Sequence, residues 1–158
     1  MKAVKPTALT SAMLISTTAT EVYSAWNAAS AYIAGGRVIY TATERVYERL
    51  VDGTTATAPN LDATNWLDIG PTNKWAMFDS EISTVTTAPT TLTTVLKPGY
   101  VNSLALFGLV GQTVTVTVQN GLAGPVVYGP EVIDLDGTVI ADWYMYFFEP
   151  FVQMAEVV

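Results

Sequence analysis

The chain of 158 residues contains no cysteine and no histidine. The absence of cysteine excludes disulfides, thiolate metal ligands and cysteine nucleophiles, so the fold must be held together by burial alone. The absence of histidine removes the usual general base, the commonest metal ligand and every Ser–His pair. The 14 acidic residues are scattered along the chain without a catalytic motif. We therefore expect no enzymatic activity, no metal site and no cofactor.

Charged residues are also scarce. They make up 13% of the chain, whereas an ordinary domain has about 25%. The net charge is −7 and no basic patch is present, which excludes nucleic acid as a partner. Hydrophobic residues make up 50%, so the chain is expected either to enter a membrane or to be covered by partner proteins.

The lengths of the apolar runs decide between these two explanations. The longest clean run, residues 104–111, is much shorter than the roughly 20 residues of a membrane-spanning helix. A secretory signal is not indicated either, because Pro6 follows Lys2 and Lys5 and the apolar run after them is short. We therefore expect a protein made in the cytoplasm, without a signal peptide or a membrane span, that forms one subunit of an assembly.

The first 20 residues are rich in Thr, Ser and Ala. Because threonine favours extended backbone, residues 1–20 are predicted to form an extended arm with a short strand near residues 13–16. An arm of this kind is ordered by a neighbour, which makes Met13, Leu14 and Ile15 candidate interface residues. A floppy terminus is the alternative.

Residues 21–70 are predicted to form a first compact unit. The runs at 37–41 and 45–51 read as two strands joined by a three-residue connection, which is typical of a β-hairpin. The polar, turn-rich stretch that follows is expected to loop back and place Trp66 on this hairpin.

Residues 71–158 are predicted to form an antiparallel β-sandwich or jelly roll. Residues 112–119 alternate strictly between threonine and valine, as in a strand with one solvated face, and residues 100–110 read as a buried strand. Tight turns are expected at Asn120-Gly121 and Asp136-Gly137. Further strands are expected within 81–96, where Pro89 interrupts the pattern, and at 126–135 and 138–148.

Aromatic residues are concentrated near the end of the chain. In a strand over 143–148, alternation would make both faces aromatic, which favours a strand covered by the sandwich on one side and by a neighbour on the other. The candidate interface residues here are Trp143, Tyr144, Tyr146, Phe148 and Phe151. Either this end pairs with another subunit or the natural polypeptide continues past Val158.

The unit at 21–70 resembles the small carbohydrate-binding module of chitinases, the type 5/12 chitin-binding fold. The matching positions are Ala25-Trp26, Tyr32, Gly35-Gly36, Val38, Tyr47, Pro59 and Trp66. The resemblance implies a small all-β unit in which Trp26, Tyr32, Tyr47 and Trp66 are candidate carbohydrate-binding residues. Family members carry exposed aromatics just after the second-strand tyrosine, but residues 48–51 here are Glu, Arg, Leu and Val. Without that platform, the four aromatics are expected to form a core.

A broader resemblance covers most of the chain. Residues 66–79, the Thr/Val-rich region after them and residues 142–150 resemble tail-associated virion proteins of tailed bacteriophages. Such proteins often pair a chitin-binding-like module with a β-sandwich. The resemblance implies a structural protein of the phage tail, baseplate or fibres, located in the virion. Its expected partners are other virion tail proteins and further copies of itself, and a host surface glycan in the alternative role of a receptor-binding module.

Two other sites can be drawn from the acidic residues. Asp134, Asp136 and Asp142 could suggest calcium, but the motif lacks the later glutamate of an EF-hand loop and reads as a turn. Asp79, Glu81 and Glu149 could suggest a glycosidase acting on cell-surface glycans. No motif supports a catalytic pair among these three carboxylates. An enzyme is therefore a weaker hypothesis than a structural virion protein or a carbohydrate-binding module.

Overall fold

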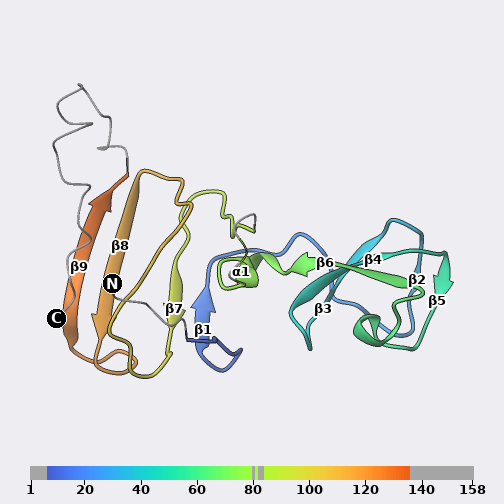
Figure 1. The fold of residues 1–158 in the computed structure, drawn as a ribbon, viewed down its shortest axis with the longest axis horizontal. Helices are drawn as coiled ribbons and strands as arrows, with labels where there is room; N and C mark the ends of the chain where they lie inside the picture. Colours follow the sequence, from blue (N-terminus) through green and yellow to red (C-terminus); the bar gives the residue numbers. More distant parts are fainter. Residues whose placement is uncertain (1–6, 80, 82–83, 136–158) are drawn as a thin grey trace, which may run out of the picture. The chain divides into compact units, whose positions relative to one another are not determined.

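The computed structural model describes residues 7–79, 81 and 84–135. The chain divides into two compact units. The first is Leu14–Val95, and the described residues of the second are 7–13 and 96–135. The described residues form strands with one 3-10 turn and one four-residue helix, and these ranges contain no longer helix, so the fold is all-β as predicted (Figure 1). The predicted boundaries after residues 20 and 70 stay predictions.

A three-stranded antiparallel sheet forms the centre of the first unit. It is built from β3 (Arg37–Tyr40), β4 (Arg45–Arg49) and β6 (Trp66–Pro71), with β4 in the middle. The predicted hairpin is confirmed, since β3 and β4 pair from Arg37↔Glu48 to Tyr40↔Arg45. The predicted return of the loop is confirmed too, because Trp66 is paired with Arg49 at the start of β6.

Smaller elements surround this sheet. The strand β2 (Ala31–Tyr32) pairs with β5 (Gly53–Thr54), η1 (Pro59–Leu61) is the 3-10 turn, and α1 (Asn73–Ala76) is the short helix. The strand β1 (Leu14–Thr17) confirms the short strand expected near residues 13–16, and it pairs with β7 (Thr94–Leu96). Within the predicted pattern at 81–96, β7 is the strand that the structure describes.

All the buried side chains of the described residues lie between 38 and 76. The apolar ones are Val38, Ile39, Val46, Tyr47, Trp66 and Ala76, each at most 7% exposed. They come from β3, β4, β6 and α1, so the core of the first unit lies on its central sheet.

A long two-stranded ribbon dominates the described part of the second unit. It consists of β8 (Thr113–Gln119) and β9 (Val126–Asp134), antiparallel and drawn in orange in Figure 1. The alternation predicted for β8 is confirmed at Val114 and Val116, which are half-buried, whereas the threonines between and beside them are exposed. The expected tight turn at Asn120-Gly121 is wrong. Gln119 pairs with Val126, and the intervening loop closes through the bond from the N–H of Asn120 to the carbonyl of Pro125.

The strand predicted at residues 100–110 is also wrong. The structure places no strand there, and Tyr100, Phe107 and Val110 are 92%, 89% and 99% exposed. A continuous apolar run predicts burial, but no layer within the described residues covers this one. The turn expected at Asp136-Gly137 and the strand expected at 138–148 lie outside the described residues.

Candidate functional site

The four aromatic residues predicted to bind sugar lie together in the first unit. Trp66 and Tyr47 form the core with Val38, and Trp26 and Tyr32 pack against it. The rings meet edge to face, with centroids 5.2 Å apart for Tyr32–Trp66 and 5.6 Å for Trp26–Tyr40. This is the favourable arrangement for aromatic rings that pack on one another in a protein interior.

Burial limits what these rings can do. Trp66 is 2% exposed and Tyr47 is 5% exposed, so neither offers the open flat face on which a sugar ring stacks. Tyr32 is half-buried, and its hydroxyl accepts the N–H of Asn27 at 2.7 Å and donates to the same residue's carbonyl at 3.2 Å. Carbohydrate binding by these residues stays a prediction, and their geometry is that of a core.

The residues after Tyr47 provide no aromatic surface, because residues 48–51 are Glu, Arg, Leu and Val. Glu48 accepts a hydrogen bond from Arg37 Nε at 2.8 Å. This contact and a hydrogen bond with the Tyr23 hydroxyl raise the pKa of Arg37, the contribution of Tyr23 being the larger. Arg49 is 3% exposed, with its guanidinium 5.0 Å from the ring centre of Trp66. A buried cation over an indole is a stabilising contact of the core.

The loop that returns to Trp66 is fastened by Asp62. The side-chain amide of Asn65 donates to both carboxylate oxygens of Asp62, at 2.8 and 2.9 Å, and the Thr55 hydroxyl donates to one of them at 3.2 Å. The Asn65 side chain is the main cause of a lowered Asp62 pKa, because its hydrogen bonds favour the ionised form. The role of Asp62 is therefore structural.

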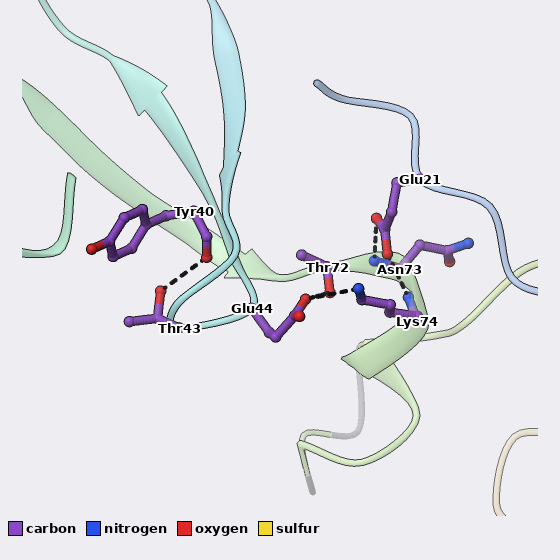
Figure 2. A network of polar contacts seen from close by, with 7 residues as sticks. All are labelled: Glu21, Tyr40, Thr43, Glu44, Thr72, Asn73 and Lys74. Carbon is purple, nitrogen blue, oxygen red and sulfur yellow. Dashed lines mark hydrogen bonds and ion pairs between the residues drawn. The ribbon is translucent and has the colours of Figure 1, made fainter. Parts of the chain in front are cut away.

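A polar network joins the β3–β4 turn to the start of α1, as Figure 2 shows. Glu44 lies in that turn with φ of 53°. Its carbonyl accepts the N–H of the fully buried Thr72 at 3.0 Å, and its carboxylate lies 3.2 Å from Lys74 Nζ. The charged pair and the backbone bond together hold the turn against α1.

The same network extends to the arm. Glu21 accepts the backbone N–H groups of Asn73 and Lys74, each at 3.0 Å (Figure 2). The Asn73 side chain donates to the carbonyls of Thr20 and Thr87, at 2.9 and 2.8 Å. Sequence reasoning missed these residues, because single polar side chains 14 to 53 positions apart carry no local signal. Their hydrogen bonds form a clamp that joins the segments at residues 20–21, 73–74 and 87.

The acidic residues that the structure describes do not converge on one point. Within the described ranges, no three of the His, Cys, Asp and Glu side chains are placed to hold a metal ion. Asp79 accepts the N–H of Glu81 at 2.9 Å and so caps a local turn. Glu149, Asp136 and Asp142 lie outside the described residues, so the predicted pairings with them are not described.

The second unit presents exposed apolar side chains instead. Residues 98–130 contain no Asp, Glu, Lys or Arg. Among them are Tyr100, Phe107 and Val110, at least 89% exposed, and Val126 and Val127, 50% and 63% exposed. No residue is buried in the described range 96–135. Where exposed apolar side chains gather in one patch, they mark an interaction site.

The predicted interface residues divide in two groups. Met13 and Leu14 are half-buried, and Ile15 is 42% exposed, at the start of the β1–β7 pair. The others, Trp143, Tyr144, Tyr146, Phe148 and Phe151, lie outside the described residues. No helix in the described ranges is long and apolar enough to cross a membrane.

No family model, curated protein or solved structure matches the chain.

Proposed function

We propose that the chain is a structural component of a bacteriophage virion tail, in the tail, baseplate or fibre region, and that it acts through protein–protein contacts. The observation that carries this proposal is the exposed apolar character of residues 98–130, where Tyr100, Phe107 and Val110 are 92%, 89% and 99% exposed. Covering these side chains with a partner protein releases their apolar surface from water, which is the main driving force of association.

The first unit supplies the rigid part of this design. Its central sheet carries the aromatic cluster, and the contacts of Glu21, Glu44 and Lys74 hold α1 to the rest of the unit. The second unit, which we propose completes an antiparallel sandwich or jelly roll, supplies the contacts. This combination suits a subunit of an assembly, because the first unit has a packed core and the second unit has exposed apolar side chains that a partner protein can cover.

The test uses the particles themselves. Antibodies raised against the purified full chain are applied to phage particles from the strain that encodes it, and the particles are viewed by negative-stain electron microscopy. We expect label on the tail, and we expect the chain among the proteins that mass spectrometry identifies in the purified particles. Particles that carry an intact tail but contain none of this chain refute the proposal.

A further inference from the structure

We propose that Asn120 is a site of spontaneous deamidation, at which the side-chain amide becomes a carboxylate without an enzyme. The backbone nitrogen of the following residue attacks the side-chain carbonyl carbon of the asparagine. A new N–C bond closes a cyclic succinimide, and the bond to the side-chain nitrogen breaks, so that this nitrogen leaves as ammonia with the proton of the attacking N–H. Water then adds to one of the ring carbonyls and opens the ring to aspartate or isoaspartate. This reactivity is independent of the proposed virion role.

The neighbour of Asn120 in the sequence favours the attack. Asn120 is followed by glycine, whereas the other five asparagines of the chain are followed by Ala, Leu, Trp, Lys or Ser. Because glycine has no side chain, nothing crowds its nitrogen as it approaches the amide carbon, and its backbone adopts conformations that other residues avoid. Gly121 uses this freedom, with a φ of 83°.

The structure leaves both reacting groups free. Asn120 and Gly121 are exposed, in the loop that joins β8 to β9. Within residues 7–79, 81 and 84–135, no hydrogen bond engages the Asn120 side chain or the N–H of Gly121. The bond that closes the loop uses the N–H of Asn120 itself, which donates to the carbonyl of Pro125 at 2.9 Å. The amide carbon and the attacking nitrogen are therefore exposed to water, without a contact that has to break first.

Three other asparagines show the opposite arrangement. After Asn60, Asn65 and Asn73, the backbone nitrogen that would attack already donates a hydrogen bond. The pairs are Leu61 N–H with the Ala58 carbonyl at 2.9 Å, Trp66 N–H with the Asp62 carbonyl at 3.0 Å, and Lys74 N–H with Glu21 Oε1 at 3.0 Å. Since these bonds have to break before the nitrogen attacks, each reaction waits for local opening of the fold.

The two remaining asparagines are restrained through their side chains. The side-chain oxygen of Asn27 accepts the N–H of Ala29 at 2.8 Å, and that of Asn102 accepts the Ser103 hydroxyl at 3.2 Å. Each is also followed by a residue with a side chain, which crowds the attacking nitrogen. Asn120 is therefore the least restrained asparagine among the described residues.

The reaction changes the loop at the end of the ribbon. Isoaspartate carries the main chain through the former side chain and so adds a methylene group to the backbone at position 120. The main chain is closely packed there, because a Cβ on Gly124 would collide with the carbonyl oxygen of Asn120. Either product also places a carboxylate within residues 98–130, which contain no charged side chain. We expect the hydrogen bond from residue 120 to Pro125 to be weakened in the isoaspartate form.

The test follows the reaction in the full chain by mass spectrometry. The purified protein is incubated in mildly alkaline buffer and digested at intervals after glutamate, which yields residues 82–131 as one peptide. Asn102 and Asn120 both lie in this peptide, so fragment masses compare them directly, and an isoaspartyl methyltransferase with labelled S-adenosylmethionine detects isoaspartate. We expect Asn120 to react about tenfold or more faster than Asn102, a difference of about 1.4 kcal/mol in activation free energy. Equal rates at the two positions overturn the proposal.

Two glycine variants test the mechanism. Gly121→Ala crowds the attacking nitrogen, and we expect it to slow the reaction at Asn120 about tenfold or more. Gly108→Ala is the matched control, since Gly108 also has a positive φ, of 62°, and open space around the position of a Cβ. The control should leave the rate at Asn120 unchanged. An equally fast reaction in Gly121→Ala contradicts the mechanism.

Unfolding in guanidinium chloride tests the structural part of the proposal. It releases the nitrogens after Asn65 and Asn73, so both asparagines should react faster, whereas Asn120 should keep its folded-state rate within about threefold. An Asn120 that reacts only in the unfolded chain shows that the folded loop protects it, which overturns the proposal. In the isolated isoaspartate form, the N–H of residue 120 should exchange its hydrogen faster than in the unmodified chain, and equal exchange refutes the weakened loop closure.

Discussion

Replacing Trp66 by alanine separates a core role from a sugar-binding role. Trp66 is 2% exposed and contacts Val38 and Tyr47 in the core, with Tyr32 edge to face at 5.2 Å and Arg49 over its ring at 5.0 Å. Tryptophan-to-alanine changes in cores cost about 3–5 kcal/mol, because the lost burial is joined by the cavity left behind. A domain's total stability is about 5–15 kcal/mol, so the change consumes a large part of it.

The measurement is urea unfolding of the full chain followed by far-UV circular dichroism. With a slope of about 1–2 kcal/mol per molar urea for a unit of this size, the loss lowers the midpoint of the first unit by about 2–4 M. Trp66→Phe is the second variant, in case the alanine variant does not fold. It keeps an aromatic partner for Tyr32, and we expect a smaller loss of about 1–2 kcal/mol.

Val22→Ala serves as the matched control, because its side chain is 83% exposed and its removal should change stability by less than about 0.5 kcal/mol. A Trp66→Ala protein that unfolds within about 1 kcal/mol of the wild type refutes the reasoning. If such a protein had also lost binding on a glycan array that the wild type shows, Trp66 would be a sugar contact rather than a core residue.

Three further changes test other contacts. Glu21→Ala leaves the N–H groups of Asn73 and Lys74 without their carboxylate, so we expect a loss of about 1 kcal/mol and faster hydrogen exchange at those two amides. Asp62→Asn tests pH dependence: the folded-state pKa of Asp62 is lowered, so its contribution is present above the unfolded value of about 3.9 and is lost as pH falls below it. Acid titration of stability should therefore be shallower in the variant. Gly35→Ala forces alanine to a φ of 81° in open space and should cost about 1 kcal/mol by thermal unfolding, whereas unchanged stability contradicts the strain.

The parts of the fold that could be predicted from sequence are those set by near neighbours. The β3–β4 hairpin follows from two β-prone runs with a short connection, and the alternation in β8 follows from its threonines and valines. The position of Trp66 on the hairpin follows from the turn-rich stretch before it, which has to double back. The aromatic cluster follows from the same reasoning, since a small unit has few other large side chains to bury.

The rest depends on contacts that a local pattern does not show. The helix α1 has four residues, too few for a helical periodicity to be visible. The clamp links Glu21 to Asn73, 52 positions later, through backbone N–H groups that point toward one carboxylate only once α1 has formed. The wrong prediction of a strand at residues 100–110 has a different cause. A continuous apolar run indicates that its side chains are buried, but it does not indicate whether the same chain or a partner protein buries them.

The pairing of β1 with β7 has a consequence for engineering. Thr17 and Thr94 are 77 positions apart, yet their hydroxyl oxygens lie 3.2 Å from each other, and the N–H of Thr18 donates to the carbonyl of Thr93 at 3.0 Å. The two ends of the unit Leu14–Val95 therefore lie side by side. A unit with adjacent ends can be inserted into a surface loop of another protein without separating the two sides of that loop. Its ends can also be joined to make a circular permutant.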